Sequence, residues 1–309
     1  MTSTFAGRRT FPFLPRRRHL VGLPFGGVAS GRVGHGTDVI GSRPYQPGDP
    51  VSSIDWFASA RLSAASGRDE FVVRTRAADE APRVMVVVDR RPAMNLYAPP
   101  LPWLSKRSAL EQVTNGIAAS AAVGNTEIGS LDLGSGEPYW IAPSRRYGPE
   151  QVDERQGSAP FDAPENTVAA SLEFLRTHRA ELAPGTFVFV LSDFIAGPDD
   201  DAWVATDAHG WDLVPVVVQD PIWERSFPPV GSVVVPIRDP HSRRVEPLRL
   251  SRREAQARQR ANESRFDELL KRFVSLGLEP IVIGTDDPDE IDQAFQRWAE
   301  ERRQWRRVV

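Results

Sequence analysis

The chain contains no cysteine, and this single absence removes several kinds of chemistry. It excludes disulfides, thiolate nucleophiles and zinc sites that depend on thiolate ligands. Lysine is also scarce, because Lys106 and Lys271 are the only lysines among the 38 basic residues. We attribute this bias to the base composition of the genome, and it restricts a Schiff-base lysine to these two positions.

Long apolar runs are missing as well. The longest, "VMVVV", "FVFVL" and "LVPVVV", are far shorter than the ~20 residues that a membrane-spanning helix needs. The N-terminus carries a twin arginine and the cluster Arg16 to Arg18, but it lacks the apolar core of an export signal. We therefore expect no transmembrane segment and a cytoplasmic location. The basic N-terminus leaves a peripheral contact with an anionic membrane open.

Neither sign of charge is in large excess. The 309 residues include 38 basic and 41 acidic ones, which gives a net charge of −3. This balance argues against nucleic-acid binding, which needs a basic surface. Apolar residues make up 40% and charged residues 26% of the chain, as in ordinary globular proteins. The length predicts one large or two medium domains.

The first 80 residues differ from the rest of the chain. They are rich in Gly, Pro and Arg and show little periodicity, so we expect an irregular, strand-poor lead segment. Within it, the sequence predicts a turn at 46–50, a short helix capped by Ser52 or Ser53, and a strand at 69–77. We place the domain boundary between a lead segment, 1–80, and a second domain, 81–309.

From residue 81 onwards, Val-rich runs alternate with segments of helical periodicity. The predicted strands are 83–89, 126–134, 137–143, 186–193, 211–220 and 278–287, with a hairpin over 231–250. The predicted helices are 105–123, 165–182, 198–209, 253–277 and 287–305. This alternation predicts an α/β fold with a doubly wound, mostly parallel sheet between two layers of helices.

Several predicted strands end in an acid. Asp89, Asp193, Asp220 and Asp286 each follow a strand of the predicted sheet. In doubly wound sheets, ligands bind at the carboxyl ends of the strands, where the strand order reverses. We therefore expect these acids to lie along one edge of the sheet.

A motif in the lead segment resembles the opening signature of the domain-of-unknown-function 58 family. The stretch "GSRPYQPGDPVSSIDWFASAR" (41–61) matches it in order and spacing. The matching residues are Arg43, Tyr45, Pro47, Gly48, Asp49, Ile54, Asp55, Trp56, Ala60 and Arg61. The likeness continues at Glu80, at "VMVVVD" and at "DPIWERSFPPVGSVVV" (220–235), so it covers most of the chain.

The resemblance implies a fold and a function. The second half of these family members is similar to a von Willebrand factor A domain, a doubly wound sheet with one antiparallel edge strand. Many members carry two N-terminal membrane helices, so this chain resembles the short form without them. Members are typically encoded beside a MoxR-type AAA+ ATPase and are thought to be its adaptor. The resemblance therefore implies a non-enzymatic interaction protein whose partners are such an ATPase and its client protein.

The resemblance also raises the question of a metal. Von Willebrand factor A domains often bind Mg²⁺ through Asp-x-Ser-x-Ser after the first strand. Here Arg91 and Ala93 stand where the two serines would be. Ala93 offers no oxygen, and at ~4 Å the fixed charge of Arg91 would repel a metal by at least a few kcal/mol. Asp193 resembles the second aspartate of such sites.

We therefore interpret Asp89, Arg91 and Asp193 as a degenerate metal-ion-dependent adhesion site, which we call the metal corner. We expect no resident cofactor, and we expect Arg90 or Arg91 to lie against Asp89 or Asp193. The metal corner is also a candidate partner surface. The alternative is a metal-dependent hydrolase or binding module that uses Asp89 and Asp193 with Mg²⁺.

The signature residues of the lead segment admit two roles. They are structural, or they form a partner-binding surface. In the structural interpretation, Asp55 pairs with Arg61, and Trp56 fills a pocket on the second domain.

Overall fold

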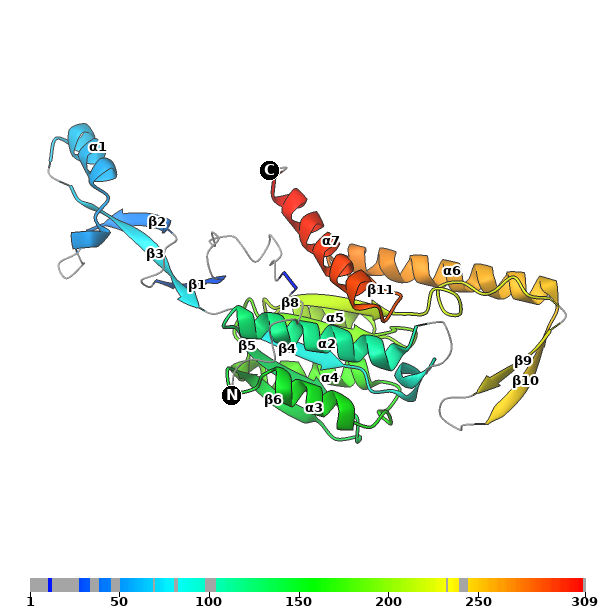
Figure 1. Cartoon of the computed structure of the whole chain (residues 1–309). Helices are drawn as coiled ribbons and strands as arrows, with labels where there is room; N and C mark the ends of the chain where they lie inside the picture. Colours follow the sequence, from blue (N-terminus) through cyan, green and yellow to red (C-terminus); the bar gives the residue numbers. More distant parts are fainter. Residues whose placement is uncertain are drawn as a thin grey trace. The chain divides into compact units, whose positions relative to one another are not determined.

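The chain forms two compact units (Figure 1). The structure is a computed structural model, and it describes residues 11–12, 28–33, 39–45, 51–68, 70–80, 83–97, 104–231, 233–238 and 244–307. One unit, the sheet unit, comprises residues 83–309 together with 1–14. The other, the lead unit, comprises residues 15–82.

The first 14 residues are grouped with the sheet unit, although we predicted that they belong to the lead segment. The described residue Phe11 accounts for this difference. Its ring stacks on Phe295 with the ring centroids 3.9 Å apart, and its backbone N–H donates to the hydroxyl of Ser120. The boundary after Pro82 lies close to the predicted one.

The sheet unit is built on a six-stranded sheet in the order β11-β8-β7-β4-β5-β6. The strands are β4 (Arg83–Val88), β5 (Glu127–Asp132), β6 (Tyr139–Ser144), β7 (Phe187–Ser192), β8 (Asp212–Val218) and β11 (Ile281–Ile283). All neighbouring pairs are parallel except β5 and β6, which are antiparallel. The predicted α/β class and the single antiparallel edge strand are confirmed.

Helices cover both faces of this sheet. They are α2 (Lys106–Val123), α3 (Pro149–Ser158), α4 (Thr167–Thr177), α5 (Asp200–Asp207), α6 (Arg252–Ser275) and α7 (Pro288–Arg307). Because side chains alternate along a strand, Val84, Val86 and Val88 pack in the core with α2, α3 and α7. Met85 and Val87 pack in the second core with α4, α5 and α6. Burial on both faces explains the uninterrupted apolar run of β4.

Helix α3 is the one long element of this unit that the sequence analysis missed. Its sequence, PEQVDERQGS, has a single large apolar residue, Val152, which is buried. With one large apolar residue, this segment shows no hydrophobic periodicity that would predict a helix. None of the described helices is both long and apolar enough to cross a membrane.

The predicted hairpin is also present. Strands β9 (Val233–Arg238) and β10 (Val245–Leu250) pair antiparallel, with Val233 opposite Leu250. Helix α6 follows directly and is capped by Ser251, whose hydroxyl accepts a hydrogen bond from the Glu254 N–H at 3.2 Å. The residues between the two strands lie largely outside the described part.

The described residues of the lead unit include three strands, in a segment that we expected to be strand-poor. Strand β3 (Val72–Glu80) pairs antiparallel with both β1 (Val28–Val33) and β2 (Val39–Pro44). The sequences of β1 and β2, VASGRV and VIGSRP, carry few apolar residues, so alternation does not reveal them. Helix α1 (Trp56–Ser66) is capped by Asp55 rather than by the predicted serines.

Candidate functional site

The candidate site lies where the strand order of the sheet reverses. The chain leaves β4 towards β5 on one side, and it leaves β7 towards β8 on the other. Asp89 follows β4 and Asp193 follows β7, and the Asp89 N–H donates to the Leu191 carbonyl at 2.9 Å. The two predicted acids therefore share the crevice in which doubly wound folds place their ligands.

The guanidinium of Arg91 lies between these two carboxylates. Its Nη2 is 2.6 Å from Oδ2 of Asp89 and 2.6 Å from Oδ1 of Asp193. Its Nε donates to both Asp89 oxygens, at 2.9 and 3.1 Å. Burial alone would lower the pKa of Arg91, but Asp89 and Asp193 raise it above its ordinary value. These contacts agree with the hypothesis that an arginine lies on the acids.

The second cation of the site is Lys106, which was not predicted from the sequence. It is the first residue of α2 and fully buried, and its Nζ is 2.9 Å from Asp193 Oδ2 and 2.5 Å from Glu224 Oε1. A positive charge in the first turn of a helix is unfavourable because it opposes the helix dipole. The lysine at the start of the predicted helix was therefore the signal in the sequence that Lys106 has a specific partner. We call Asp89, Arg91, Lys106, Asp193 and Glu224 the ion-pair cluster.

Burial and the neighbouring charges shift the pKa values of the residues in the ion-pair cluster. Burial would raise the pKa of Asp193, yet Lys106 and Arg91 hold that pKa below its usual value. Burial would lower the pKa of Lys106, but Asp193 and Glu224 raise it. Burial raises the pKa of Glu224, and the charge of Asp193 adds to this effect against the opposing charge of Lys106. Of these two acids, Asp193 is therefore the more firmly ionised, and Glu224 takes up a proton more readily.

The carboxylate of Asp220 lies at the same edge of the sheet, where it binds backbone N–H groups rather than a cation. Its carboxylate accepts hydrogen bonds from the backbone N–H groups of Leu104, Ile222 and Trp223, at 3.1, 2.8 and 2.7 Å. It therefore ties the loop after β8 to the segment that leads into α2. The fourth predicted acid, Asp286, has no contact with the cluster in the described part of the chain.

Two residues beside the cluster have a left-handed backbone. Phe194, directly after Asp193, has φ 52°, and Tyr97 has φ 62°. Such a conformation costs a bulky residue of order 1–3 kcal/mol and persists where the surrounding contacts determine it. The hydroxyl of Ser192 supplies one such contact, because it accepts the Phe194 N–H at 3.1 Å and donates to Asp89 at 2.6 Å.

The neighbouring Arg90 contacts residues outside the ion-pair cluster. Its Nη2 donates to Gln156 Oε1 at 2.6 Å, and its guanidinium lies 4.9 Å from the centre of the Phe161 ring. Burial lowers the pKa of Arg90 to about 10, although Asp132 opposes this effect. Of the two predicted arginines, Arg91 is therefore the one that contacts the acids of the metal corner.

The residues present do not fit a bound Mg²⁺. Every carboxylate oxygen of Asp89 and Asp193 already accepts a hydrogen bond from the protein. Mg²⁺ needs about six oxygen ligands at ~2.0–2.1 Å, and here two fixed cations hold the acids that would supply them. Among the described residues, no group of three or more His, Asp or Glu side chains is arranged to hold a metal.

We therefore expect calorimetric titration of the protein with Mg²⁺ or Mn²⁺ to give no saturable heat. The variant Asp89→Ala serves as the control for weak, non-specific binding elsewhere. Micromolar binding to the unmodified chain that disappears in Asp89→Ala would contradict this prediction. The metal-dependent alternative would then regain its support.

The metal corner is buried. Asp89 and Arg91 are each 2% exposed and Asp193 is 0% exposed. In this conformation their side chains fix the strand ends and do not themselves present a surface to a partner.

The signature residues lie on several elements of the lead unit. Arg43 is on β2, Tyr45 follows it, and Asp55 accepts the Ala58 N–H at 3.1 Å as the cap of α1. Gly48 and Asp49 lie outside the described residues. The Nε of Arg61 donates to the carbonyl of Phe57 at 3.4 Å, and the pair of Asp55 and Arg61 stays a prediction.

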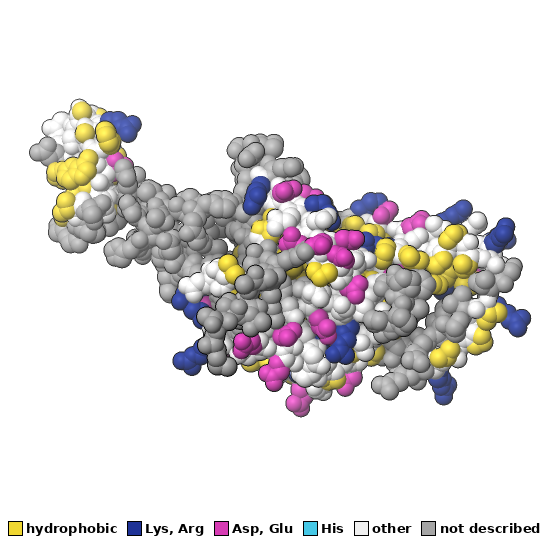
Figure 2. All heavy atoms as spheres, viewed as in Figure 1, with side chains coloured by type: hydrophobic (Ala, Val, Ile, Leu, Met, Phe, Trp, Pro, Cys, Tyr) yellow, Lys and Arg dark blue, Asp and Glu magenta, His cyan; other side chains and the backbone are white. Residues whose placement is uncertain are grey.

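Trp56 belongs to an exposed group of aromatic side chains. The Trp56 ring is 6.1 Å from the Phe71 ring, and the Tyr45 ring is 6.4 Å from the same ring. Trp56 is 58% exposed, Phe71 46% and Tyr45 36%. Figure 2 shows hydrophobic side chains gathered over this unit. We call Tyr45, Trp56 and Phe71 the aromatic patch; that Trp56 fills a pocket on the other unit stays a prediction.

Comparison with solved structures finds similar chains at low identity. BatB from Bacteroides thetaiotaomicron is 12% identical with a TM-score of 0.41, over 71% of this chain and 100% of that one. An aerotolerance-related membrane protein from Bacteroides fragilis is 13% identical with a TM-score of 0.44, over 72% and 100%. A von Willebrand factor type A protein from Catenulispora acidiphila is 12% identical with a TM-score of 0.38, over 73% and 44%.

Comparison with curated proteins finds no significant match. The family model described as "Protein of unknown function DUF58" matches residues 41–268. This match begins at the signature of the lead segment, includes the ion-pair cluster and ends within α6. Because it spans well over half of the 309 residues, the chain belongs to the DUF58 family.

Proposed function

We propose that this chain is a non-enzymatic protein-interaction module that works with a MoxR-type AAA+ ATPase. Its task would be the assembly or activation of a client protein. Membership of the DUF58 family and the doubly wound sheet unit support a module of this kind. The observation that carries the proposal is the aromatic patch of the lead unit.

The aromatic patch has the properties of a protein-binding surface. Trp and Tyr are enriched among the residues that contribute most to binding energy, and large exposed apolar groups usually mark an interaction site. A hydrogen bond connects α1, which carries Trp56, with β3, which begins directly after Phe71. The hydroxyl of Ser59 on α1 accepts the Val72 N–H of β3 at 2.9 Å and donates to the Asp55 carbonyl at 2.7 Å. Little ordering entropy would then be lost when a partner binds.

The ion-pair cluster supports a non-enzymatic role. A hydrolase that used Asp89 and Asp193 would need at least one of these carboxylates free to bind a metal or to accept a proton. Both are buried and hold a cation at 2.6 Å. A cytoplasmic location belongs to the same proposal, and cell fractionation tests it.

We expect crosslinking of the tagged chain in its native cells, followed by mass spectrometry, to recover an AAA+ ATPase. Trp56→Ala and Phe71→Ala should each reduce the recovered ATPase at least tenfold, because a central aromatic residue contributes ~2 kcal/mol or more to binding. Val123→Ala is the matched control, since Val123 on α2 is 76% exposed and lies outside the patch. Its recovery should not change.

Two results would contradict the proposal. One is the absence of any AAA+ ATPase from the crosslinked material. The other is equal recovery with Trp56→Ala, Phe71→Ala and the unmodified chain, which would remove the aromatic patch from the interaction. Circular dichroism of each variant shows whether its fold is retained.

A further inference from the structure

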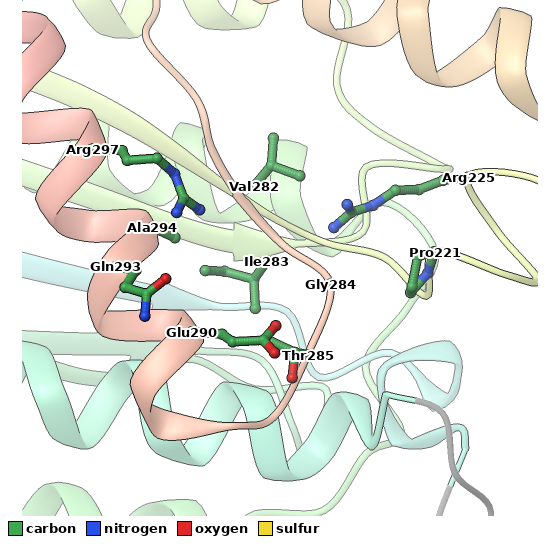
Figure 3. A pocket seen from close by; sticks show the side chains of 10 residues that line it. All are labelled: Pro221, Arg225, Val282, Ile283, Gly284, Thr285, Glu290, Gln293, Ala294 and Arg297. Atoms are coloured by element: carbon green, nitrogen blue, oxygen red, sulfur yellow. The ribbon is translucent and has the colours of Figure 1, made fainter.

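A cavity of about 540 Å³ opens at the carboxyl ends of β8 and β11, against the first turns of α7. Figure 3 shows its walls. Arg225, from the loop after β8, and Arg297, from α7, reach in from opposite sides. The remaining polar lining comes from Thr285, Glu290 and Gln293. Ligands of doubly wound folds bind at this edge of the sheet.

In the part of the chain that the structure describes, the two arginines have no acceptor for their guanidinium hydrogen-bond donors. Within the described part of the chain, neither guanidinium forms a hydrogen bond or an ion pair. The Nε and Nη2 atoms of Arg225 are buried without an acceptor. Buried donors without acceptors are rare in folded proteins, and each one calls for an explanation such as a ligand. In the described part of the chain, Arg225 has buried donors that lack an acceptor, and the exposed Arg297 faces the same cavity. Two positive groups on one cavity favour an anion as the ligand.

The fold holds Arg225 in this position. Its guanidinium lies over the Phe266 ring, 5.1 Å from the ring centre. On the other side the backbone of Gly284 approaches so closely that a Cβ there would lie 2.7 Å from Nη2. Glycine at position 284 therefore makes room for the guanidinium. The stacked ring and the close backbone leave Arg225 little freedom to turn away from the cavity.

The acids near Arg225 do not consume its donors. Asp220 and Glu224 act on its charge electrostatically. The oxygens of Asp220 accept backbone N–H groups, and those of Glu224 bind Lys106 and the Asp220 N–H. Glu290 is the acid that lines the cavity itself, and in the described part it forms no ion pair with either arginine.

We propose that this cavity binds a phosphate group, either free or carried by a small phosphomonoester. A phosphate presents oxygens in several directions, so guanidinium groups on opposite walls can both donate to it. A carboxylate has two oxygens in one plane, and a single guanidinium can donate to both of them. The Thr285 hydroxyl and the Gln293 amide add donors, and Glu290 can accept a hydroxyl of the organic part. This proposal is independent of the AAA+ partner.

Isothermal titration of the full chain with inorganic phosphate and with glycerol phosphate tests the proposal. We expect saturable binding at one site per chain for at least one of the two ligands. Arg225→Gln and Arg297→Gln should each weaken it at least tenfold. Gly284→Ala keeps both charges but displaces the Arg225 guanidinium, so it should weaken binding too. Arg303→Gln removes an exposed arginine of α7 outside the cavity and should leave the affinity unchanged.

Three outcomes would overturn the proposal. The first is no saturable binding of either phosphate compound. The second is equal weakening by Arg303→Gln and Arg297→Gln, which would indicate general charge attraction. The third is succinate binding as tightly as the phosphate compounds, which would assign the cavity to carboxylates. Because Arg297 is exposed, its variant tests the cavity even if a change at Arg225 disturbs the fold.

Discussion

Replacing Arg91 with methionine is expected to lower the free energy of unfolding by about 3–5 kcal/mol. Methionine keeps the apolar part of the side chain but leaves Asp89 and Asp193 buried side by side without the guanidinium between them. Asp89 would retain the hydrogen bonds from Ser192 and from its own turn, and Asp193 would retain Lys106. Those contacts do not replace a cation that bonds both acids at 2.6 Å.

Urea unfolding followed by circular dichroism measures this loss. Arg107→Met is the matched control, because Arg107 pairs with Glu111 on the surface of α2 and its side chain is 43% exposed. Its expected cost is ~0–1 kcal/mol. Arg91→Lys should lie between the two, since an ammonium cannot reproduce the fork that reaches both acids. A loss below ~1 kcal/mol in Arg91→Met would show that Arg91 does not hold the strand ends together.

Replacing Lys106 with methionine is expected to cost about 3–5 kcal/mol at neutral pH, and this cost should depend on pH. Lys106 is fully buried, and its loss leaves Glu224 without the cation that it contacts directly. The pKa of Glu224 is already raised by burial and by Asp193, and the loss of Lys106 raises it further. A raised carboxyl pKa favours the folded state below the unfolded pKa of ~4.3, and this advantage disappears as the pH rises through the folded pKa.

The variant Lys106→Met should therefore be less destabilised at pH 5 than at pH 8. Urea unfolding at both pH values measures the difference. The double variant Lys106→Met/Glu224→Gln removes the group that titrates and should lose most of this pH dependence. An equal loss at both pH values, or an unchanged pH dependence in the double variant, would contradict the assignment of Glu224 as the acid that depends on Lys106.

The contact of Arg91 with the acids could be predicted because its causes are local. Asp89 and Arg91 are two residues apart after a strand, and parallel strands bring the end of β7 beside the end of β4. The pairing of Lys106 with Glu224 could not be predicted in this way. Glu224 comes from an irregular loop after β8, and only the completed strand order brings that loop to the start of α2.

In the lead unit, part of the secondary structure likewise depends on contacts that the local sequence does not reveal. Strands β1 and β2 have no apolar alternation of their own and become strands by pairing with β3. The helix α1 was predictable in place, but the choice between Ser52, Ser53 and Asp55 as its cap depends on the backbone angles at the helix start. The structure places Asp55 there in an extended conformation, with φ −87° and ψ 93°.

The position of Arg91 has a consequence for how this site responds to its surroundings. A metal ion at the end of a sheet is exchangeable, so chelators can remove it and its occupancy follows the concentration of free ion. A guanidinium attached to the chain has no dissociation constant and is present in every folded molecule. Arg91, together with Lys106 on Asp193, therefore offsets the charges of Asp89 and Asp193 at any level of divalent cation.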